Sequence, residues 1–308
     1  MIKRTLFFSN PAYLSMEHAQ LVVRQKSNNH DSKDTPKEEV IRTIPIEDIG
    51  MMVLENRQIT ITSGLISAVV DNNTAVVTCD SRCMPTGLLL PLSGNSIQNE
   101  RFRAQLDATQ PLRKQLCQQT ISMKIANQGK VLKMNTEVEC GCMEAWSKDV
   151  RSGDPMNLEA RAAAYYWKNI FSTIPEFTRD REGDYPNNML NYGYAILRAI
   201  VARSLVGSGL LPTLGIHHQN RYNAYCLADD IMEPYRPFVD QLVLKLMKEY
   251  PGVEELTKEI KAKLLTIPTL DVVINRKRSP LMVATTLTTA SLAKCFTGEI
   301  RKIDYPEL

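Results

Sequence analysis

Two adjacent histidines distinguish this sequence, because only four of its 308 residues are His. His217 and His218 are followed by three closely spaced carboxylates, Asp229, Asp230 and Glu233. Carboxylate oxygens combined with one imidazole nitrogen suit manganese or magnesium, and histidine can also act as a general acid. The segment is therefore a candidate for metal-dependent or acid–base chemistry.

Helical spacing would bring these carboxylates together. If residues 223–233 form a helix, Glu233 shares a face with both aspartates, at i,i+3 and i,i+4. Like charges on one face destabilise a helix unless a cation lies between them. A divalent metal could supply that charge, and so could Arg221 or Arg236. Acidic clusters on helices are more often simply solvated, so the residues alone leave these interpretations open.

A further carboxylate of interest is Glu159, in the segment 158–167 (LEARAAAYYW). Ala162 and Ala163 follow one turn later on the same face, and small side chains let another helix or a ligand approach closely. The segment also has a purely structural explanation. Alanine favours helices, and a glutamate near a helix start interacts favourably with the helix dipole.

The elements that must position these side chains change in character near residue 95. Before it, short runs rich in β-forming residues alternate with turn formers, at 5–8, 19–24, 51–54, 58–62 and 74–78. Residues 63–70 are typical of a short helix, and 27–37 of a polar surface loop. After it, apolar residues recur at helical spacing, most clearly over 101–126.

We therefore predict an α+β fold. A small, mostly antiparallel β domain at residues 1–95 precedes a larger, all-helical domain at residues 96–308, which carries the candidate catalytic residues. The polar stretch 301–308 is expected to be a flexible tail.

Composition and missing motifs exclude several classes of protein. The 37 basic and 34 acidic residues give a net charge of +3, and 44% of the residues are hydrophobic, as in globular proteins. No apolar run approaches the ~18 residues of a membrane helix, so we expect a cytoplasmic protein. The seven cysteines lack the paired spacing of zinc sites and are expected to be reduced. Dinucleotide, Walker, nucleophile-elbow and zinc-protease motifs are absent.

Four segments, taken in order, resemble one known family: 158–167 (LEARAAAYYW), 190–198 (LNYGYAILR), 209–218 (GLLPTLGIHH) and 223–237 (NAYCLADDIMEPYRP). They are similar to segments of the CRISPR-associated spacer-acquisition integrases, the Cas-one endonuclease family. The MEPYRP ending and the short chain resemble the form that accompanies type II systems.

The resemblance implies a metal site for Mg²⁺ or Mn²⁺. The family's ligand positions fall on Glu159, His218 and Glu233, and Asp230 matches a further family acid that supports the site. Glu233 stands where the family often has Asp, and Ala160 where Gly often follows the glutamate. The implied reaction is attack of a spacer's 3′-hydroxyl on a phosphodiester of the CRISPR repeat, and water in its place would give endonuclease cleavage.

The resemblance also implies partners. Double-stranded DNA is the substrate, and a homodimer formed through the β domains would join the small Cas-two protein in a larger complex. Basic side chains of the helical domain would hold DNA phosphates. The candidates are Arg161, Arg198, Arg203, Arg221, Arg236, Arg276, Lys277 and Arg278.

Two other functions remain possible from the residues alone. One is a DNA-binding scaffold without catalysis, whose acids have a structural role. The other is an unrelated metal-dependent hydrolase of small phosphoesters. The complete acid set favours the integrase over the scaffold, and the order of the four segments favours it over the hydrolase.

Overall fold

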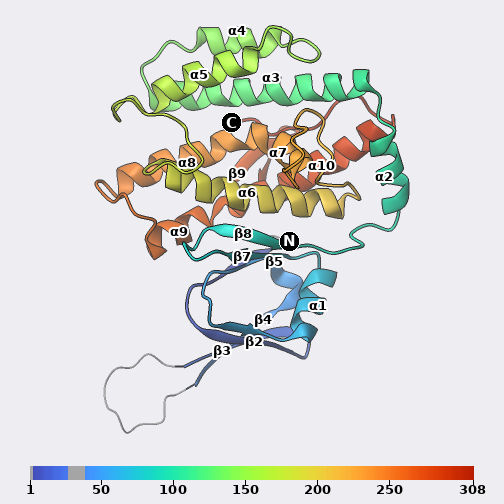
Figure 1. The fold of residues 1–308 in the computed structure, drawn as a ribbon, viewed down its shortest axis with the longest axis vertical. Coiled ribbons are helices and arrows are strands. Elements are labelled where there is room, and N and C mark those ends of the chain that lie inside the picture. Colours follow the sequence, from blue (N-terminus) through green and yellow to red (C-terminus); the bar gives the residue numbers. More distant parts are fainter. Residues whose placement is uncertain (1–2, 27–38) are drawn as a thin grey trace. The chain divides into compact units, whose positions relative to one another are not determined.

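The computed structural model describes residues 3–26 and 39–308, and the chain divides into two compact units, Met1–Gly94 and Asn95–Leu308. Strands dominate the described part of the first unit, and helices dominate the second (Figure 1). The predicted α+β class is confirmed. The stretch 27–37, predicted as a loop, lies outside the described residues.

The described residues of the first unit form two four-stranded sheets. One has the strand order β1 (Arg4–Phe8), β5 (Ile49–Leu54), β7 (Ala75–Cys79), β8 (Pro85–Leu89). The other has the order β4 (Glu39–Pro45), β3 (Gln20–Lys26), β2 (Ala12–Glu17), β6 (Ile59–Ile61). Of these strands, β2, β4 and β8 were not predicted.

The prediction of a mostly antiparallel domain is wrong for the first sheet, which is mixed. Strands β1 and β5 run parallel, as do β5 and β7, and only β7 and β8 are antiparallel. Helix α1 (Ser63–Asp71) precedes β7 and returns the chain to the end of the sheet where β5 begins. Such a crossover is what parallel neighbours require. In the second sheet, β2 and β6 are also parallel.

The core of the first unit lies where α1 packs against inward-facing residues of both sheets. Leu65 and Val69 of α1 are fully buried, and Thr62 caps the helix by accepting a hydrogen bond from the amide of Leu65. Alternation sets the faces of β2, because Leu14 is buried while its neighbour Tyr13 is exposed.

The second unit is built around α3 (Gln110–Asn135). Helices α4 (Gly141–Asp149) and α5 (Leu158–Ile170) pack along one side of α3, and α8 (Arg236–Glu249) packs against another part of it (Figure 1). The remaining elements are α6 (Asn187–Gly207), α7 (Cys226–Met232), the 3-10 turn η2 (Glu233–Tyr235), α9 (Lys258–Leu264), the 3-10 turn η3 (Ile267–Thr269) and α10 (Leu281–Phe296).

Two details of the helical prediction are corrected. The helical stretch predicted over 101–126 is interrupted, because α2 (Gln98–Leu106) ends before Thr109, which caps α3. The unit is also not all-helical. Strands β9 (Asp271–Ile274) and β10 (Lys277–Pro280) form an antiparallel hairpin.

The stretch 301–308, predicted to be a flexible tail, is packed against the second unit. Ile303 and Tyr305 are buried, and the Tyr305 hydroxyl lies 2.7 Å from the hydroxyl of Thr120 on α3. The side-chain amide of Asn127 donates to the carbonyls of Pro306 and Pro234, at 3.0 and 2.9 Å. The last residues and the turn that begins with Glu233 therefore share one hydrogen-bond donor on α3.

Candidate metal centre

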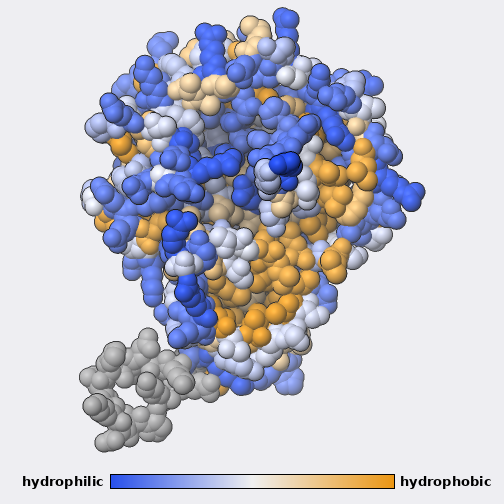
Figure 2. All heavy atoms as spheres, viewed as in Figure 1, coloured by the Kyte–Doolittle hydropathy of each residue, from blue (hydrophilic) through white to orange (hydrophobic). Residues whose placement is uncertain are grey.

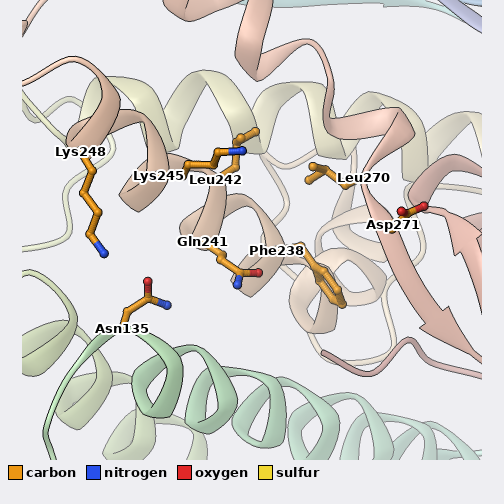
Figure 3. A pocket seen from close by; sticks show the side chains of 8 residues that line it. All are labelled: Asn135, Phe238, Gln241, Leu242, Lys245, Lys248, Leu270 and Asp271. Carbon is orange, nitrogen blue, oxygen red and sulfur yellow. The ribbon is translucent and has the colours of Figure 1, made fainter.

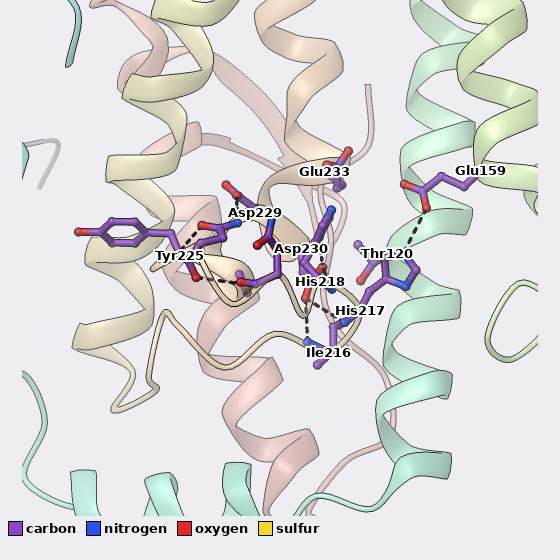
Figure 4. Close-up of polar contacts among 12 residues, drawn as sticks. Thr120, Glu159, Ile216, His217, His218, Tyr225, Asp229, Asp230 and Glu233 are labelled. Atoms are coloured by element: carbon purple, nitrogen blue, oxygen red, sulfur yellow. Dashed lines mark hydrogen bonds and ion pairs between the residues drawn. The ribbon is translucent and has the colours of Figure 1, made fainter. Parts of the chain in front are cut away.

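Three of the predicted site residues come from different elements and line one small pocket of the second unit. Glu159 lies in the first turn of α5, Glu233 opens η2, and His218 lies in the loop between α6 and α7. Figure 4 shows their side chains converging, with His217 and Asp230 also lining the pocket. The four predicted catalytic residues are thus brought together by the fold.

The start of α5 is fixed by an aspartate that sequence reasoning missed. The Asp154 carboxylate accepts hydrogen bonds from the amides of Leu158 and Glu159, each at 2.9 Å. A carboxylate at this end satisfies donors that have no partner within the helix. Asp154 therefore fixes the first turn of α5, from which the Glu159 side chain extends into the pocket.

The histidine loop is held by one buried carboxylate, Asp230. Its oxygens accept hydrogen bonds from the backbone amides of Ile216, His217 and His218, at 2.7, 3.0 and 3.1 Å. Gly215 permits this close approach, since a Cβ there would lie 2.3 Å from the carbonyl oxygen of His218 and 2.8 Å from Asp230. Asp230 therefore ties the histidine loop to α7.

Asp230 also orients the ring of His218. Nδ1 of the ring lies 2.5 Å from Oδ1 of Asp230, and this hydrogen bond raises the pKa of His218 against the opposing effect of burial. The neighbouring ring of His217 is half exposed, and its Nε2 lies 3.9 Å from Glu159.

The pocket has a cation that the sequence prediction did not include. The ammonium nitrogen of Lys124, on α3, lies 2.7 Å from Oε1 of Glu159 and 2.7 Å from Oε2 of Glu233. Burial by itself would lower the pKa of Lys124, but the two carboxylates raise it, so the ammonium stays charged. Helical spacing offered a signal, since Lys124 shares a face with the buried residues Ile121 and Gln128.

Glu233 is engaged by two cations. Arg236 lies 3.0 Å from Oε1 of Glu233, and its guanidinium stacks 4.9 Å from the ring centre of Tyr194. Burial alone would raise the pKa of Glu233, but Arg236 and Lys124 lower it to about 2. The carboxylate is therefore ionised at any ordinary pH.

Behind Arg236 lies a buried carboxylate, Asp240. It accepts hydrogen bonds from the hydroxyls of Tyr166, at 2.8 Å, and Tyr194. Burial raises the pKa of Asp240 to about 6, although both tyrosines and the nearby arginines oppose this. Tyr194 thus connects Asp240 with Arg236, the arginine that binds Glu233.

Asp229 does not line the pocket with Glu233, because its carboxylate binds other partners. Arg198 binds Asp229 through two nitrogens, at 2.6 and 2.9 Å, and the amide of Asn223 donates to the same carboxylate at 2.8 Å. This cluster anchors the segment before α7 and lies beside the pocket without lining it (Figure 4).

The donor set has the chemistry of a hard-cation site. Over residues 3–26 and 39–308, no three His, Cys, Asp or Glu side chains are arranged as a ready-made metal cage. Two carboxylates nevertheless bind one cation, the Lys124 ammonium, and both of them line the pocket together with His218. Cys117 also lines the pocket, and burial raises its pKa to about 12, so it does not offer a thiolate. Oxygen donors with one imidazole fit magnesium or manganese.

The predicted DNA-binding residues differ in accessibility. Arg203 is buried, 7% exposed within α6, which conflicts with a DNA contact. Arg198 and Arg236 are committed to Asp229 and Glu233. Arg161 and Arg221 are exposed and stack on Trp146 and Tyr222, respectively. The other exposed candidates form the tip of the β9–β10 hairpin: Arg276, Lys277 and Arg278.

A larger hollow of the second unit, of about 360 Å³, contains none of the predicted site residues (Figure 3). Phe238, Leu242 and Leu270 form its apolar part, while Lys245 and Lys248 stand at its edge. Its remaining lining residues are Asn135, Gln241 and Asp271. The candidate catalytic residues therefore line the smaller pocket and not this larger hollow.

This fold and its acid–imidazole centre define a two-unit α+β protein of a known class. The chain belongs to the Cas1 (Cas-one) family, since the family model described as "CRISPR associated protein Cas1" matches residues 6–266. The resemblance seen in the four sequence segments is confirmed. In the described part of the chain, no helix is both long and apolar enough to cross a membrane.

The chain is 35% identical over 285 residues to the CRISPR-associated endonuclease Cas1 of Neisseria meningitidis, covering 92% of this chain and 89% of the relative. Two solved structures share the fold. A casposase bound to integration product has a TM-score of 0.77 at 20% identity, covering 99% of this chain and 93% of that one. A CAS1 protein from Thermotoga maritima has a TM-score of 0.73 at 15% identity, covering 96% and 97%.

Proposed function

We propose that this protein is a metal-dependent DNA endonuclease and integrase that inserts DNA spacers into a CRISPR array. The observation that carries the proposal is the convergence of Glu159, Glu233 and His218 on one pocket, where both carboxylates already bind a cation. The relative from Neisseria is named a CRISPR-associated endonuclease, which supports the same activity and the type II-like form.

The metal would be held by Glu159, Glu233 and the Nε2 atom of His218. Asp230 occupies Nδ1 of that ring, and this is the usual way in which a carboxylate fixes the tautomer of a histidine ligand. A divalent ion bound there would polarise a phosphoryl oxygen and stabilise the charge that develops on it.

The proposed reaction is a phosphodiester exchange. The 3′-hydroxyl of the spacer attacks phosphorus, a new ester bond forms, and the bond from phosphorus to the 3′-oxygen of the repeat breaks. The attacking hydroxyl gives up a proton and the leaving oxygen gains one. In the alternative role, His218 would donate that proton instead of binding metal, and the hydrogen bond to Asp230 that raises its pKa would favour the protonated ring. Water in place of the hydroxyl would give cleavage.

The exposed basic side chains are proposed to hold the DNA backbone. Arg161 lies two residues after Glu159 on α5, and Arg221 lies three residues after His218. The β9–β10 tip adds three adjacent basic residues, at 276–278. Such contacts position a duplex without reading its sequence.

The first unit is proposed to form a homodimer. Figure 2 shows hydrophobic side chains gathered over β8 and α1 of this unit. An apolar hollow there is lined by Ile66, Val70, Leu89 and Leu92, and Leu92 is 97% exposed. Exposed apolar surface of this kind marks interaction sites. A similar fold occurs in a Cas6-RT-Cas1–Cas2 complex, which supports a small Cas2 partner for this chain as well.

The test is strand transfer of a short duplex with free 3′-hydroxyls into a supercoiled plasmid that carries the repeat, with Cas2 present. Wild type is compared with Glu233→Gln, in Mn²⁺ and in EDTA. Glu144→Gln is the matched control, because Glu144 pairs with Lys148 on the exposed surface at the same 2.7 Å distance. We expect joining that needs metal, that is lost in Glu233→Gln and that is unchanged in the control.

Other results would change the proposal. Joining by folded Glu233→Gln at the wild-type rate would overturn the assigned site. DNA binding without any joining, with the cognate repeat and Cas2 present, would favour the scaffold. Turnover of small phosphoesters without a DNA preference would favour the unrelated hydrolase.

A further inference from the structure

Lys124 takes up carboxylate oxygens that the proposed metal would need. Its ammonium nitrogen lies 2.7 Å from one oxygen of Glu159 and 2.7 Å from one oxygen of Glu233. Its side chain is only 13% exposed, so water screens these contacts weakly. The ammonium therefore stands where a cation bridging the two carboxylates would stand.

Both oxygens of Glu233 already contact a side-chain cation. Oε2 contacts Lys124 and Oε1 contacts Arg236, at 2.7 and 3.0 Å. A metal on either oxygen would lie beside one of these side-chain cations, and the repulsion between the two positive charges favours movement of the side chain.

Lys124 is the cation that can move. The guanidinium of Arg236 is planar and is held between Glu233 and the ring of Tyr194. Lys124 carries a point charge on a flexible four-carbon stem, so its charged group is the less rigidly placed of the two.

We propose that Lys124 is a built-in competitor of the metal, which occupies the cation position between Glu159 and Glu233 and is displaced when the divalent ion binds. The inference rests on the metal site proposed above. It makes Lys124 a positioning residue. In the metal-free protein its ammonium keeps two carboxylates from repelling each other, and the affinity for metal is reduced by the free energy needed to break its two ion pairs.

The test measures Mn²⁺ binding by the full-length protein without DNA, by calorimetry and by the loss of the free Mn²⁺ electron paramagnetic resonance signal. Lys124→Met removes the charge. Lys124→Gln also removes it but keeps an NH₂ group that can donate hydrogen bonds, should the first variant fold poorly. Lys148→Met is the matched control, because that lysine forms an exposed 2.7 Å ion pair with Glu144. The thermal shift produced by Mn²⁺ is recorded for each protein.

We expect both Lys124 variants to bind Mn²⁺ about tenfold or more tightly than wild type, with a larger thermal shift, and Lys148→Met to match wild type. Equal affinity in wild type and the Lys124 variants would overturn the competition and leave the metal site standing. Weaker binding in the variants would also overturn it, since Lys124 would then be organising the ligands for the metal. No Mn²⁺ binding by any of these proteins would overturn the inference and the metal site together.

Discussion

Replacing Asp230 by asparagine tests how the histidine loop is held in place. The wild-type carboxylate accepts three backbone amides, from residues 216–218, and contacts Nδ1 of His218. Asparagine has nearly the same shape but offers one acceptor oxygen and a donor NH₂ group. That NH₂ group would face amides that are donors themselves.

The size of the effect follows from the hydrogen bonds that asparagine cannot accept. Asparagine can keep about two of the four interactions, and a hydrogen bond to a charged group contributes about 1.5–3 kcal/mol. Part of this stabilisation is recovered because the loop can open toward water, since His217 is exposed. We therefore expect Asp230→Asn to lower the free energy of unfolding by about 3 kcal/mol.

The pH dependence gives the prediction a second readout. The hydrogen bond to Asp230 raises the pKa of His218 in the folded protein. The hydrogen bond stabilises the protein most at a pH below about 6.5, the pKa of histidine in the unfolded chain. This stabilisation is lost as the pH rises through the higher pKa that His218 has in the folded protein. The stability difference between wild type and Asp230→Asn should therefore be larger at about pH 6 than at about pH 9.

The assay combines urea unfolding at both pH values with NMR titration of the His218 ring. Asp230→Asn should return the His218 titration toward the ordinary histidine range. If the variant kept the wild-type titration of His218 and lost less than about 0.5 kcal/mol, the account of Asp230 as the organiser of the loop would be refuted.

Two further predictions concern other parts of the second unit. Burial raises the pKa of Asp240 to about 6, so folding favours the protonated carboxyl group. The contribution of this group to the free energy of unfolding is therefore largest below about pH 4 and is lost as the pH rises through about 6. In wild type, this group should lower the free energy of unfolding by about 3 kcal/mol between about pH 4 and pH 8, and Asp240→Asn should abolish that decrease in urea unfolding experiments. A pH profile of stability that is the same in the variant as in wild type would contradict this. Gly215→Ala should reduce strand transfer by about tenfold or more, because the new Cβ would meet the His218 carbonyl at 2.3 Å. Gly64→Ala, where a Cβ meets nothing within 4 Å, is the control and should keep wild-type activity.

The sequence predicted the fold class and the helix at 63–70, but not the strand directions. Strands such as β5 and β7 show their length and composition locally. Whether two strands run parallel depends on the path of the chain between them. The sequence predicted the helix α1 between β5 and β7, but the prediction did not include that this crossover makes the two strands parallel. Packing explains the error at 301–308. The segment has polar residues, yet Ile303 and Tyr305 find a buried place on α3 that no local pattern reveals.

The candidate site was predictable where its residues lie within one segment or match the family. The spacing of Asp230 and Glu233 is visible in the sequence, whereas the three amides bound by Asp230 depend on the fold of a distant loop. Lys124 lies 35 residues before Glu159 and was missed, because only the packing of α3 against α5 brings them together. Whether Glu159, His218 and Glu233 bind metal remains a prediction.

The packing of residues 303–308 bears on how the protein is made. Asn127 donates to the carbonyls of Pro234 and Pro306, so a contact next to Glu233 shares its donor with a residue translated about 70 positions later. Every candidate ligand leaves the ribosome before this segment. In a nascent chain that lacks it, Asn127 would bind the Pro234 carbonyl alone, so the buried hydrogen bonds next to Glu233 would be complete only when the second unit is almost entirely synthesised.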